Sequence, residues 1–306
     1  MPVTAADEAM HEPGPEPLWN ESWYFDVADP DRELGVYLRL GRYPNRDETW
    51  LHLAVAGRDR PLVVLVDQGA SLPVDGAAYE GAGWRAEVEA EPLGAWHLAL
   101  AGEGRRFADP MAAAGDGPGE AVPVALDLTW DAVGEPYHYE VTTRYEVSCR
   151  VRGTLRVGDE ELVIDAPGQR DHSWGVRDWW AFGWCWSAGA LDDGSAFHVA
   201  DIRFAGGSAG FGYVLAPGGT LTRAGSIVAE ESLGADDVPT GARLAVVPDG
   251  VALSLEPVAL VPVAFVADDG RAARMIRALC RYRADDGRTG AGWTEWNQLR
   301  DVPERS

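Results

Sequence analysis

The sequence predicts an all-β protein built from antiparallel strands. Short apolar runs recur along the chain, and many alternate polar and apolar residues with period two, which is typical of strands with one buried face. Turn signals such as DDG, PGG and PDG separate these runs at hairpin spacing, and 36 Gly and 20 Pro indicate many turns. Strands without intervening helices favour meanders that close as barrels or sandwiches.

The predicted strands begin after Trp23 and continue almost to the end of the chain. Only the segment AARMIRALC at 272–280 has a helix-like composition, and it is short. The predicted strand ranges are 35–41, 49–56, 61–67, 95–101, 122–130, 142–157, 160–166, 181–190, 196–204, 210–216, 242–247, 250–266, 273–284 and 290–298.

A length of 306 residues favours two domains over one. Residues 1–18 are rich in Glu and Pro, so we predict a flexible N-terminal arm there. A first β domain is predicted at 19–155 and a second at 156–306, and the motif RDHSWG falls in the second.

Composition excludes several classes of function. The formal net charge is −23 and all 26 basic residues are Arg, so the chain lacks the basic footprint needed to bind nucleic acid or anionic membranes. Three widely spaced cysteines fit a reducing compartment. The N-terminus has no signal-peptide pattern, and no apolar run is long enough to span a membrane. These features predict a cytoplasmic protein. They do not distinguish a monomer from an oligomer.

Residues 168–186, GQRDHSWGVRDWWAFGWCW, form the strongest candidate site. Five of the 13 Trp lie between Trp174 and Trp186, interleaved with acids, Arg and one His. Amphipathic aromatic side chains beside ionisable groups are typical of a small-molecule pocket. The alternative is a buried structural corner in which Arg–Asp pairs and indoles fill space.

The next hairpin offers a candidate acid. If Asp193 and Gly194 form a two-residue turn, Trp186 lies opposite Asp201 and Trp184 opposite Arg203. An Asp packed between indoles is desolvated, which raises its pKa and favours the protonated acid. An ion pair of Asp201 with Arg203 or Arg177 would act the other way, and both possibilities remain open. His198 would point to the opposite face, where a packing role is the more common one.

The sequence predicts neither a cofactor nor a metal. It contains no GxGxxG, GxxxxGK[ST], HExxH or GxSxG pattern. His172 with Asp171, Asp178 and His198 matches no strong pattern of metal ligands.

The segment Gly168–Gly175 resembles the D-H-x-W-G motif of the carotenoid 1,2-hydratase, AttH-like and lipocalin-type Diels–Alderase superfamily. GQRDHSWGVRDWW and GRTGAGWTEWN at 287–297 are most similar to actinobacterial members. This resemblance implies two tandem lipocalin-like, calycin-like β-barrels with little helix. It also implies that His172, Trp174 and the downstream acid Asp201 take part in protonating an isoprenoid double bond. The Tyr that the hydratases carry near this acid is Val199 here, which argues against carotenoid hydration itself.

The leading hypothesis is therefore a cofactor-independent lyase, or an isomerase or cyclase, that protonates an alkene in an apolar isoprenoid- or steroid-like molecule. Asp201 would be the acid, His172 would orient it, and Asp171 would be an ionised partner of Arg170. Glu295 is a weaker second acid. The predicted substrate-binding residues are Trp174, Trp179, Trp184, Trp186, Arg170, Arg177 and Arg203. The alternatives are a non-catalytic lipid or terpenoid carrier and a pericyclase-like scaffold that acts by shape alone.

Overall fold

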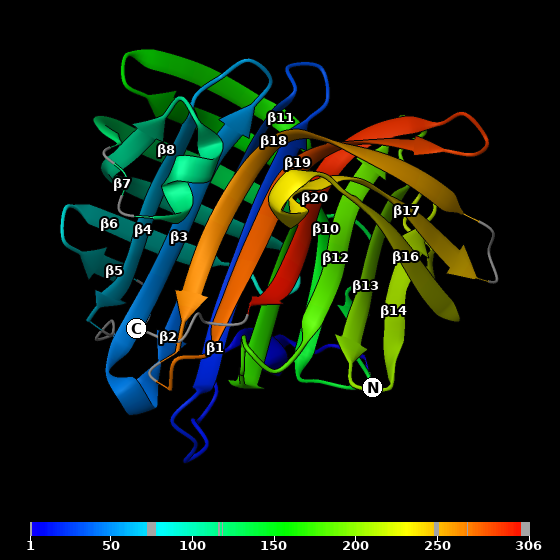
Figure 1. The fold of residues 1–306 in the computed structure, drawn as a ribbon, viewed down its shortest axis with the longest axis horizontal. Helices are drawn as coiled ribbons and strands as arrows, with labels where there is room; N and C mark the ends of the chain where they lie inside the picture. The colour runs from blue at the N-terminus through cyan, green and yellow to red at the C-terminus, as the bar shows by residue number, and fades with distance from the viewer. Residues whose placement is uncertain are drawn as a thin grey trace.

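The computed structural model describes residues 2–71, 78–115, 117, 119–247, 251–267 and 269–300. These residues form antiparallel strands and four short 3₁₀ helices, with no α-helix in the described ranges (Figure 1). The all-β prediction is therefore confirmed. The helix-like segment 272–280 forms part of a strand, because it packs between two neighbouring strands that supply its backbone hydrogen bonds. The 3₁₀ helices are η1 (Ala5–Glu8), η2 (Pro44–Arg46), η3 (Pro110–Ala114) and η4 (Ala235–Asp237).

The first sheet contains the strands of the N-terminal half. Its order is β4-β3-β2-β1-β11-β10-β8-β7-β6-β5, and β9 pairs with β10. Strand β4 also pairs with β7, so the sheet closes on itself as a barrel. Its strands are β1 (Trp19–Asp29), β2 (Leu34–Tyr43), β3 (Glu48–Gly57), β4 (Leu62–Ala70), β5 (Ala78–Gly81), β6 (Trp84–Ala90), β7 (Ala95–Phe107), β8 (Glu120–Ala132), β9 (Tyr137–His138), β10 (Arg144–Val157) and β11 (Glu160–Val176).

The second sheet has the order β15-β14-β13-β12-β20-β19-β18-β17-β16. It curls into a half-barrel, and Gly210 on β14 lies against Ile227 on β16. Its strands are β12 (Gly183–Leu191), β13 (Ala196–Phe204), β14 (Gly207–Leu215), β15 (Leu221–Arg223), β16 (Ser226–Leu233), β17 (Pro239–Val247), β18 (Ala252–Val266), β19 (Ala272–Ala284) and β20 (Thr289–Arg300).

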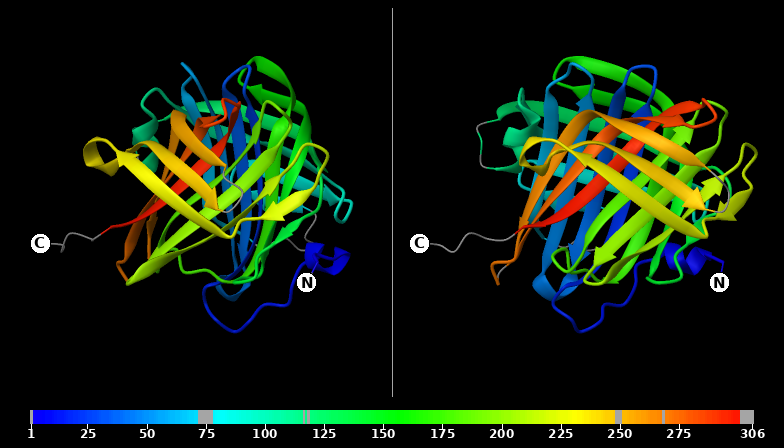
Figure 2. Two further views of the ribbon diagram at one scale, coloured as in Figure 1. Left: turned by 90° about the vertical axis from the view of Figure 1, so that its right-hand side faces the viewer. Right: turned by 45° about the vertical axis from the view of Figure 1, so that its right-hand side comes forward.

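The two sheets pack face to face, so the strands between them are buried on both sides. Figures 1 and 2 show β19 in orange and β20 in red passing over the blue β1 and β2. In β1, Trp23 and Phe25 point into the first barrel, whereas Tyr24 and Ala28 point toward the second sheet. The indole N–H of Trp293 on β20 donates to the backbone carbonyl of Val27 across this boundary, at 3.1 Å. The strict alternation of side chains along a strand therefore assigns neighbouring residues to different compartments.

Strand β11 corrects the predicted domain boundary at 155/156. It hydrogen-bonds between β1 and β10, which places RDHSWG on the first sheet rather than the second. The chain passes from one sheet to the other between Val176 and Gly183. The predicted strand 160–166 stops too early because the charged residues of the motif resemble a loop, yet each of them is buried in the strand.

The hairpin between β12 and β13 corrects the predicted register. The loop has three residues, because the Leu191 amide donates to the Ser195 carbonyl at 2.8 Å and Gly194 adopts a φ of +83°. Trp184 therefore lies opposite Ile202, and Cys185 lies opposite Asp201. A shift of one residue moves every side chain of one strand to the other face relative to its partners. Asp201 consequently shares a face with Cys185 and not with the two Trp.

The N-terminal segment is packed rather than loose, which corrects the prediction of a flexible arm. Glu8 is buried against the first barrel, where its carboxylate pairs with Arg170 at 2.9 Å and accepts from the Trp96 indole at 2.5 Å. The His11 ring stacks on Trp174 with 3.8 Å between ring centroids. Residues 2–18 therefore cover part of the first barrel.

Candidate functional site

The candidate site is a cavity of about 530 Å³ between the two sheets. Strands β1, β2, β10 and β11 form one wall, and β12, β13, β14, β19 and β20 form the other. The connection 177–182 borders it. Large apolar side chains that remain exposed line the mouth: Val141, Val176, Phe182 and Phe204. An apolar rim of this kind suits the entry of an apolar molecule.

Aromatic side chains make up much of the cavity wall. Tyr24 packs edge-on against Trp186, with ring centroids 5.5 Å apart. Trp184 donates its indole N–H to Glu295 at 2.6 Å. The ring centroids of Trp179 and Trp184 are 5.8 Å apart. These rings offer faces that stabilise positive charge on a bound molecule.

Asp171 is the carboxyl group whose pKa suits proton transfer in this cavity. Burial raises the pKa of Asp171 to about 6, although the nearby Arg144 guanidinium opposes the shift and Glu146 adds to it. Arg144 contacts Asp171 at 2.7 Å and Glu146 at 2.7 Å. A carboxyl group with a pKa near neutrality exists in both protonation states at working pH, as general acid–base catalysis requires.

A buried hydrogen-bond network lies beneath this acid. The carboxylate of Glu146 accepts from the Tyr139 hydroxyl at 3.1 Å, the Gln169 amide at 2.5 Å and the Trp186 indole at 3.2 Å. The Tyr139 hydroxyl also contacts the Nε2 atom of His198. Burial and Arg144 lower the pKa of His198 well below its ordinary value, so this ring is neutral. Tyr139 lines the cavity, and the network holds it in place.

Four guanidinium groups also reach the cavity. Arg144 is paired with Asp171 and Glu146. Arg277 forms an ion pair with Glu295. The Arg277 guanidinium also lies over the Tyr24 and Tyr37 rings, at 4.4 and 4.5 Å from their centroids. Arg39 lies over the Trp179 ring at 5.0 Å. Arg177 follows directly after β11, and burial together with Arg144 and Arg39 lowers its pKa to about 10.

The cavity brings together part of the predicted site. Of the candidate residues, it is lined by Asp171, Glu295, Trp179, Trp184, Trp186 and Arg177. The predicted partnership of Asp171 with Arg170 is wrong, because neighbouring residues on a strand point to opposite faces. Arg170 points into the first barrel and pairs with Glu8, whereas the partner of Asp171 is Arg144.

Asp201 and Arg203 do not line the cavity. Within the half-barrel of the second sheet, the carboxylate of Asp201 contacts Arg203 at 3.3 Å, and Arg203 contacts Glu231 at 2.7 Å. Of the two alternatives for Asp201, this geometry therefore agrees with the ion pair to Arg203 and not with a desolvated acid between indoles. The register of the hairpin accounts for it, since Asp201 faces away from Trp184 and Trp186.

His172 and Trp174 lie on the first-barrel face of β11. The Nδ1 atom of His172 donates to the Asp7 carbonyl at 2.9 Å, and its Nε2 atom lies 3.1 Å from the Glu21 carboxylate. The Glu21 carboxylate also accepts from His11 at 2.8 Å. Within the described ranges, this His11, Glu21 and His172 group is the one that could hold a metal ion. Its members already satisfy one another by hydrogen bonds.

Sequence reasoning missed Tyr24, Arg39, Tyr139, Arg144 and Arg277, all of which line the cavity. Tyr24 on β1 and Tyr139 after β9 place phenol rings in the cavity wall, and their hydroxyls donate to Asp26 and Glu146. Two of the missed residues carry a local signal, since Arg39 and Arg277 lie between apolar neighbours, in YLRLG of β2 and MIRAL of β19. The others come together only through the packing of the two sheets.

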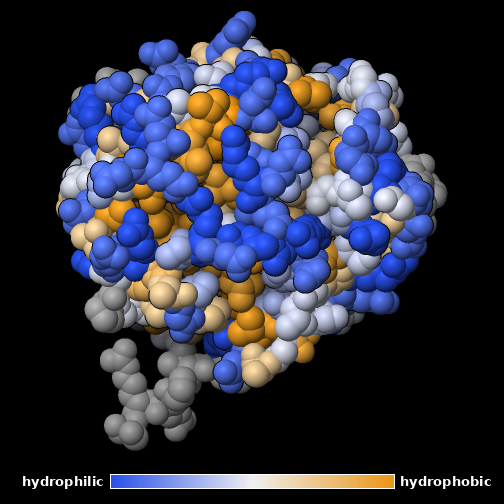
Figure 3. Space-filling view, turned by 90° about the horizontal axis from the view of Figure 1, so that it is seen from above, coloured by the Kyte–Doolittle hydropathy of each residue, from blue (hydrophilic) through white to orange (hydrophobic). Residues whose placement is uncertain are grey.

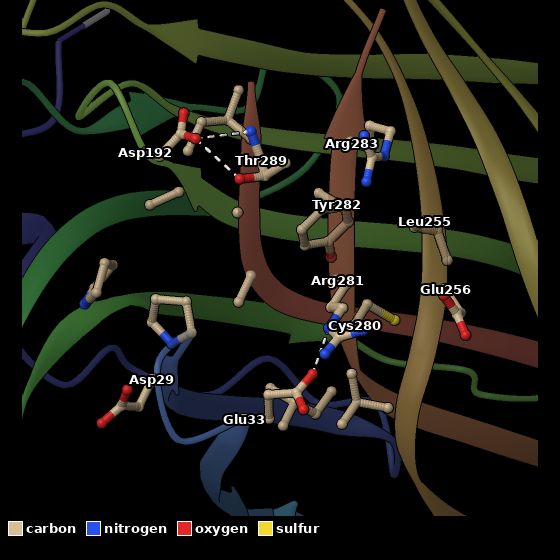
Figure 4. A pocket seen from close by; sticks show the side chains of 18 of the residues that line it. Asp29, Glu33, Asp192, Leu255, Glu256, Cys280, Arg281, Tyr282, Arg283 and Thr289 are labelled. Carbon is tan, nitrogen blue, oxygen red and sulfur yellow. Dashed lines mark hydrogen bonds and ion pairs between the residues drawn. The ribbon is translucent and has the colours of Figure 1, made fainter. Parts of the chain in front are cut away.

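A second cavity, of about 610 Å³, lies at the other end of the sheets. Seen from above, polar side chains cover most of the surface at this end, with apolar ones visible between them (Figure 3). In the cavity, Asp192 accepts from Thr289 at 2.9 Å and Glu33 pairs with Arg281 (Figure 4). It has no wall of indoles among its lining residues. The inter-sheet cavity, with its aromatic wall and titratable Asp171, is therefore the better candidate site.

A pH dependence of stability follows from Asp26 in the same inter-sheet layer. Burial raises its pKa to about 7, against the opposing effects of the Tyr24 hydrogen bond and Arg277. The folded state holds the proton of the Asp26 carboxyl more tightly than the unfolded chain does. The contribution of protonated Asp26 to the free energy of unfolding is therefore present at low pH and is lost as pH rises through about 7. We expect Asp26 to lower the free energy of unfolding by up to about 1.4 kcal/mol per pH unit between about pH 4 and 7.

Urea unfolding of the wild type and Asp26→Asn at several pH values measures this effect. The variant should show a flatter profile of stability against pH, because Asn does not titrate. Its Oδ1 can still accept from the backbone N–H of Gln169, as the Asp26 carboxyl does at 2.9 Å. Parallel profiles would show that Asp26 is not titrating in this range.

The fold and this cavity define a two-sheet, lipocalin-like β protein. The chain belongs to the family described as Domain of unknown function (DUF7064), whose model matches residues 4–300. No curated protein matches it. In the described residues, no helix has the length and apolar character needed to cross a membrane.

Solved structures share the fold. Kievitone hydratase from Nectria haematococca has a TM-score of 0.63 at 13% identity, covering 97% of this chain and 93% of that one. CghA with Sch210972 has a TM-score of 0.60 at 14% identity, covering 94% and 89%. An AttH-like protein of Nitrosomonas europaea has a TM-score of 0.59 at 15% identity, covering 91% and 92%. The superfamily resemblance drawn from the sequence is thus confirmed at the level of the fold.

Proposed function

We propose that this protein is a cofactor-independent enzyme that protonates an alkene in an apolar, isoprenoid- or steroid-like molecule. The supporting observation is the aromatic cavity between the sheets, which contains the titratable carboxyl group of Asp171. The names of two structural neighbours, a hydratase and a protein bound to Sch210972, are consistent with small-molecule chemistry in this fold. The three cysteines are free and buried, and we propose a reducing, cytoplasmic setting for the protein.

In the proposed reaction, protonated Asp171 delivers its proton to one alkene carbon, and the other carbon becomes cationic. The ring faces of Trp184 and Trp186 stabilise this charge, and Arg144 stabilises the carboxylate left on Asp171. Water addition, loss of another proton or ring closure then completes a hydration, an isomerisation or a cyclisation. The proton released in that step returns to Asp171 or to solvent.

Deuterium incorporation tests this chemistry directly. The protein is incubated in D₂O with a panel of polyunsaturated isoprenoids and steroids, and the products are analysed by mass spectrometry. Alkene protonation places one deuterium on carbon in the product. Binding without turnover would favour a terpenoid carrier, and turnover without deuterium would favour a scaffold that acts by shape alone.

The cavity walls give a prediction for binding. Trp184→Ala and Trp186→Ala are each expected to weaken the binding of an isoprenoid by about tenfold or more, because each removes a large apolar contact worth about 1.5–3 kcal/mol. Intrinsic Trp fluorescence of the wild type should respond to the ligand. Trp84→Phe, in the first barrel and outside the cavity lining, serves as the control. Unchanged binding in both alanine variants would assign these rings a structural role.

A further inference from the structure

The positive charge in the inter-sheet cavity exceeds what its carboxylates neutralise. Arg144 is paired with Asp171 and Glu146, and Arg277 is paired with Glu295. The remaining lining acid, Asp178, contacts Arg271 at 2.9 Å. Arg39 and Arg177 form no ion pair with any carboxylate in the described part of the chain. Two guanidinium groups in a chain of net charge −23 thus lie in the cavity without a direct ion pair to a described carboxylate.

Arg39 is buried and only partly satisfied. The residue is 7% exposed, and its Nη2 atom donates to the Asn20 side-chain oxygen at 3.1 Å. Its Nη1 atom has no hydrogen-bond partner among the described residues. The absence of a Cβ at Gly41 makes room for this group, since a Cβ there would lie 2.5 Å from Nη1. Burial of an unsatisfied guanidinium donor is costly unless a partner completes it.

Arg177 lies beside Arg39 without a partner for its side chain. It has no hydrogen bond or ion pair to another described side chain, while its backbone N–H donates to the Leu18 carbonyl and fixes the start of the connection between the sheets. Burial, together with the positive charges of Arg144 and Arg39, lowers the pKa of Arg177, against the opposing effect of Asp171. An anion bound between Arg39 and Arg177 would remove this repulsion.

We propose that the ligand of this cavity carries an anionic oxygen, a carboxylate or an enolate, that Arg39 and Arg177 bind, with its apolar body against the aromatic wall. The proposal rests on the proposed function, because it describes the substrate of the same cavity. Arg is well suited to this role, since its planar N–H groups bind carboxylates in pairs and it stays charged when buried. Asp171 on β11 and Arg39 on β2 both pair with Tyr24 of the intervening β1. Asp171 would therefore lie near this anion, which favours its protonated form.

Two fluorescent probes of the same shape test this proposal. 8-Anilinonaphthalene-1-sulfonate carries an anionic group, and N-phenyl-1-naphthylamine is its neutral counterpart. We expect the anionic probe to bind the wild type more tightly, and each probe to displace the other. Arg177→Gln and Arg39→Leu should each weaken the anionic probe about tenfold to hundredfold, the effect of losing a charge-assisted hydrogen bond. Binding of the neutral probe should stay within about threefold.

The control variant is Arg243→Gln, which removes an exposed Arg paired with Asp285 outside the cavity. It should bind both probes as the wild type does. Circular dichroism checks that each variant is folded, and Arg177→Gln decides the question if Arg39→Leu does not fold. Equal affinities for the two probes, or equal losses for both in the Arg variants, would overturn the proposed anion site while leaving an apolar binding cavity. Failure of both probes to bind would overturn the cavity as a ligand site, and with it the proposed function.

Discussion

Replacing Asp171 with Asn is expected to lower turnover by about 10²- to 10⁴-fold, the usual contribution of a general acid. Asn keeps the size of the side chain and one oxygen that can accept from Arg144, but it has no transferable proton. Ligand affinity should therefore stay within a few-fold of the wild type. Steady-state kinetics with a substrate found in the D₂O screen, together with a fluorescence binding titration, measure the two effects separately.

The pH profile gives an independent reading of the same residue. Turnover of the wild type should fall as pH rises above about 6, because burial raises the pKa of Asp171 to about 6 and the acid form is lost above it. Asp201→Asn is the matched control, since Asp201 pairs with Arg203 in the half-barrel of the second sheet. This variant should leave turnover unchanged if the protein folds. Normal turnover in Asp171→Asn would exclude it as the acid and favour catalysis by shape. A large loss in folded Asp201→Asn would restore the acid predicted from the sequence.

Replacing Glu8 with Ala is expected to lower the free energy of unfolding by about 3–5 kcal/mol, the cost of removing one partner of a buried ion pair. Both side chains of the Glu8–Arg170 pair are 2% exposed, so Arg170 would keep a buried charge without its partner. The substitution also removes the acceptor of the Trp96 indole N–H. Urea or thermal unfolding at neutral pH measures the loss.

Two further variants separate this pair from a general effect of the N-terminal segment. Glu12→Gln changes an exposed acid four residues away and should leave stability unchanged. The double variant Glu8→Leu with Arg170→Met replaces the pair by apolar side chains of similar size and should recover much of the loss. A Glu8→Ala variant as stable as the wild type would mean that residues 2–18 leave the barrel in solution.

The sequence predicted the fold class because side-chain alternation and turn residues are local signals. It also predicted a candidate site in the stretch 168–186, since five indoles beside several charges form an unusual composition. It did not predict the division of this stretch between compartments. Asp171 and His172 are adjacent in sequence, yet Asp171 faces the inter-sheet cavity and His172 faces the first barrel.

The wrong placement of Asp201 beside the two Trp has a specific physical cause. The DDG sequence permits both a two-residue and a three-residue loop, and the choice changes the strand register by one. Gly194 adopts its positive φ as the third loop residue, which pairs Leu191 with Ser195. Arg144 was missed for a different reason: its partners Asp171 and Glu146 are identified only when β10 and β11 are paired in the correct register.

The wall shared by the two sheets makes the halves of this chain interdependent during folding. Tyr24, Tyr37 and Trp293 are buried only where one sheet covers the other. A fragment ending near residue 176 would present these apolar faces of β1 and β2 to water, and such surfaces drive aggregation. The unfolding of the two sheets should accordingly be one cooperative transition, and the barrel made first on the ribosome would need protection until β19 and β20 are synthesised.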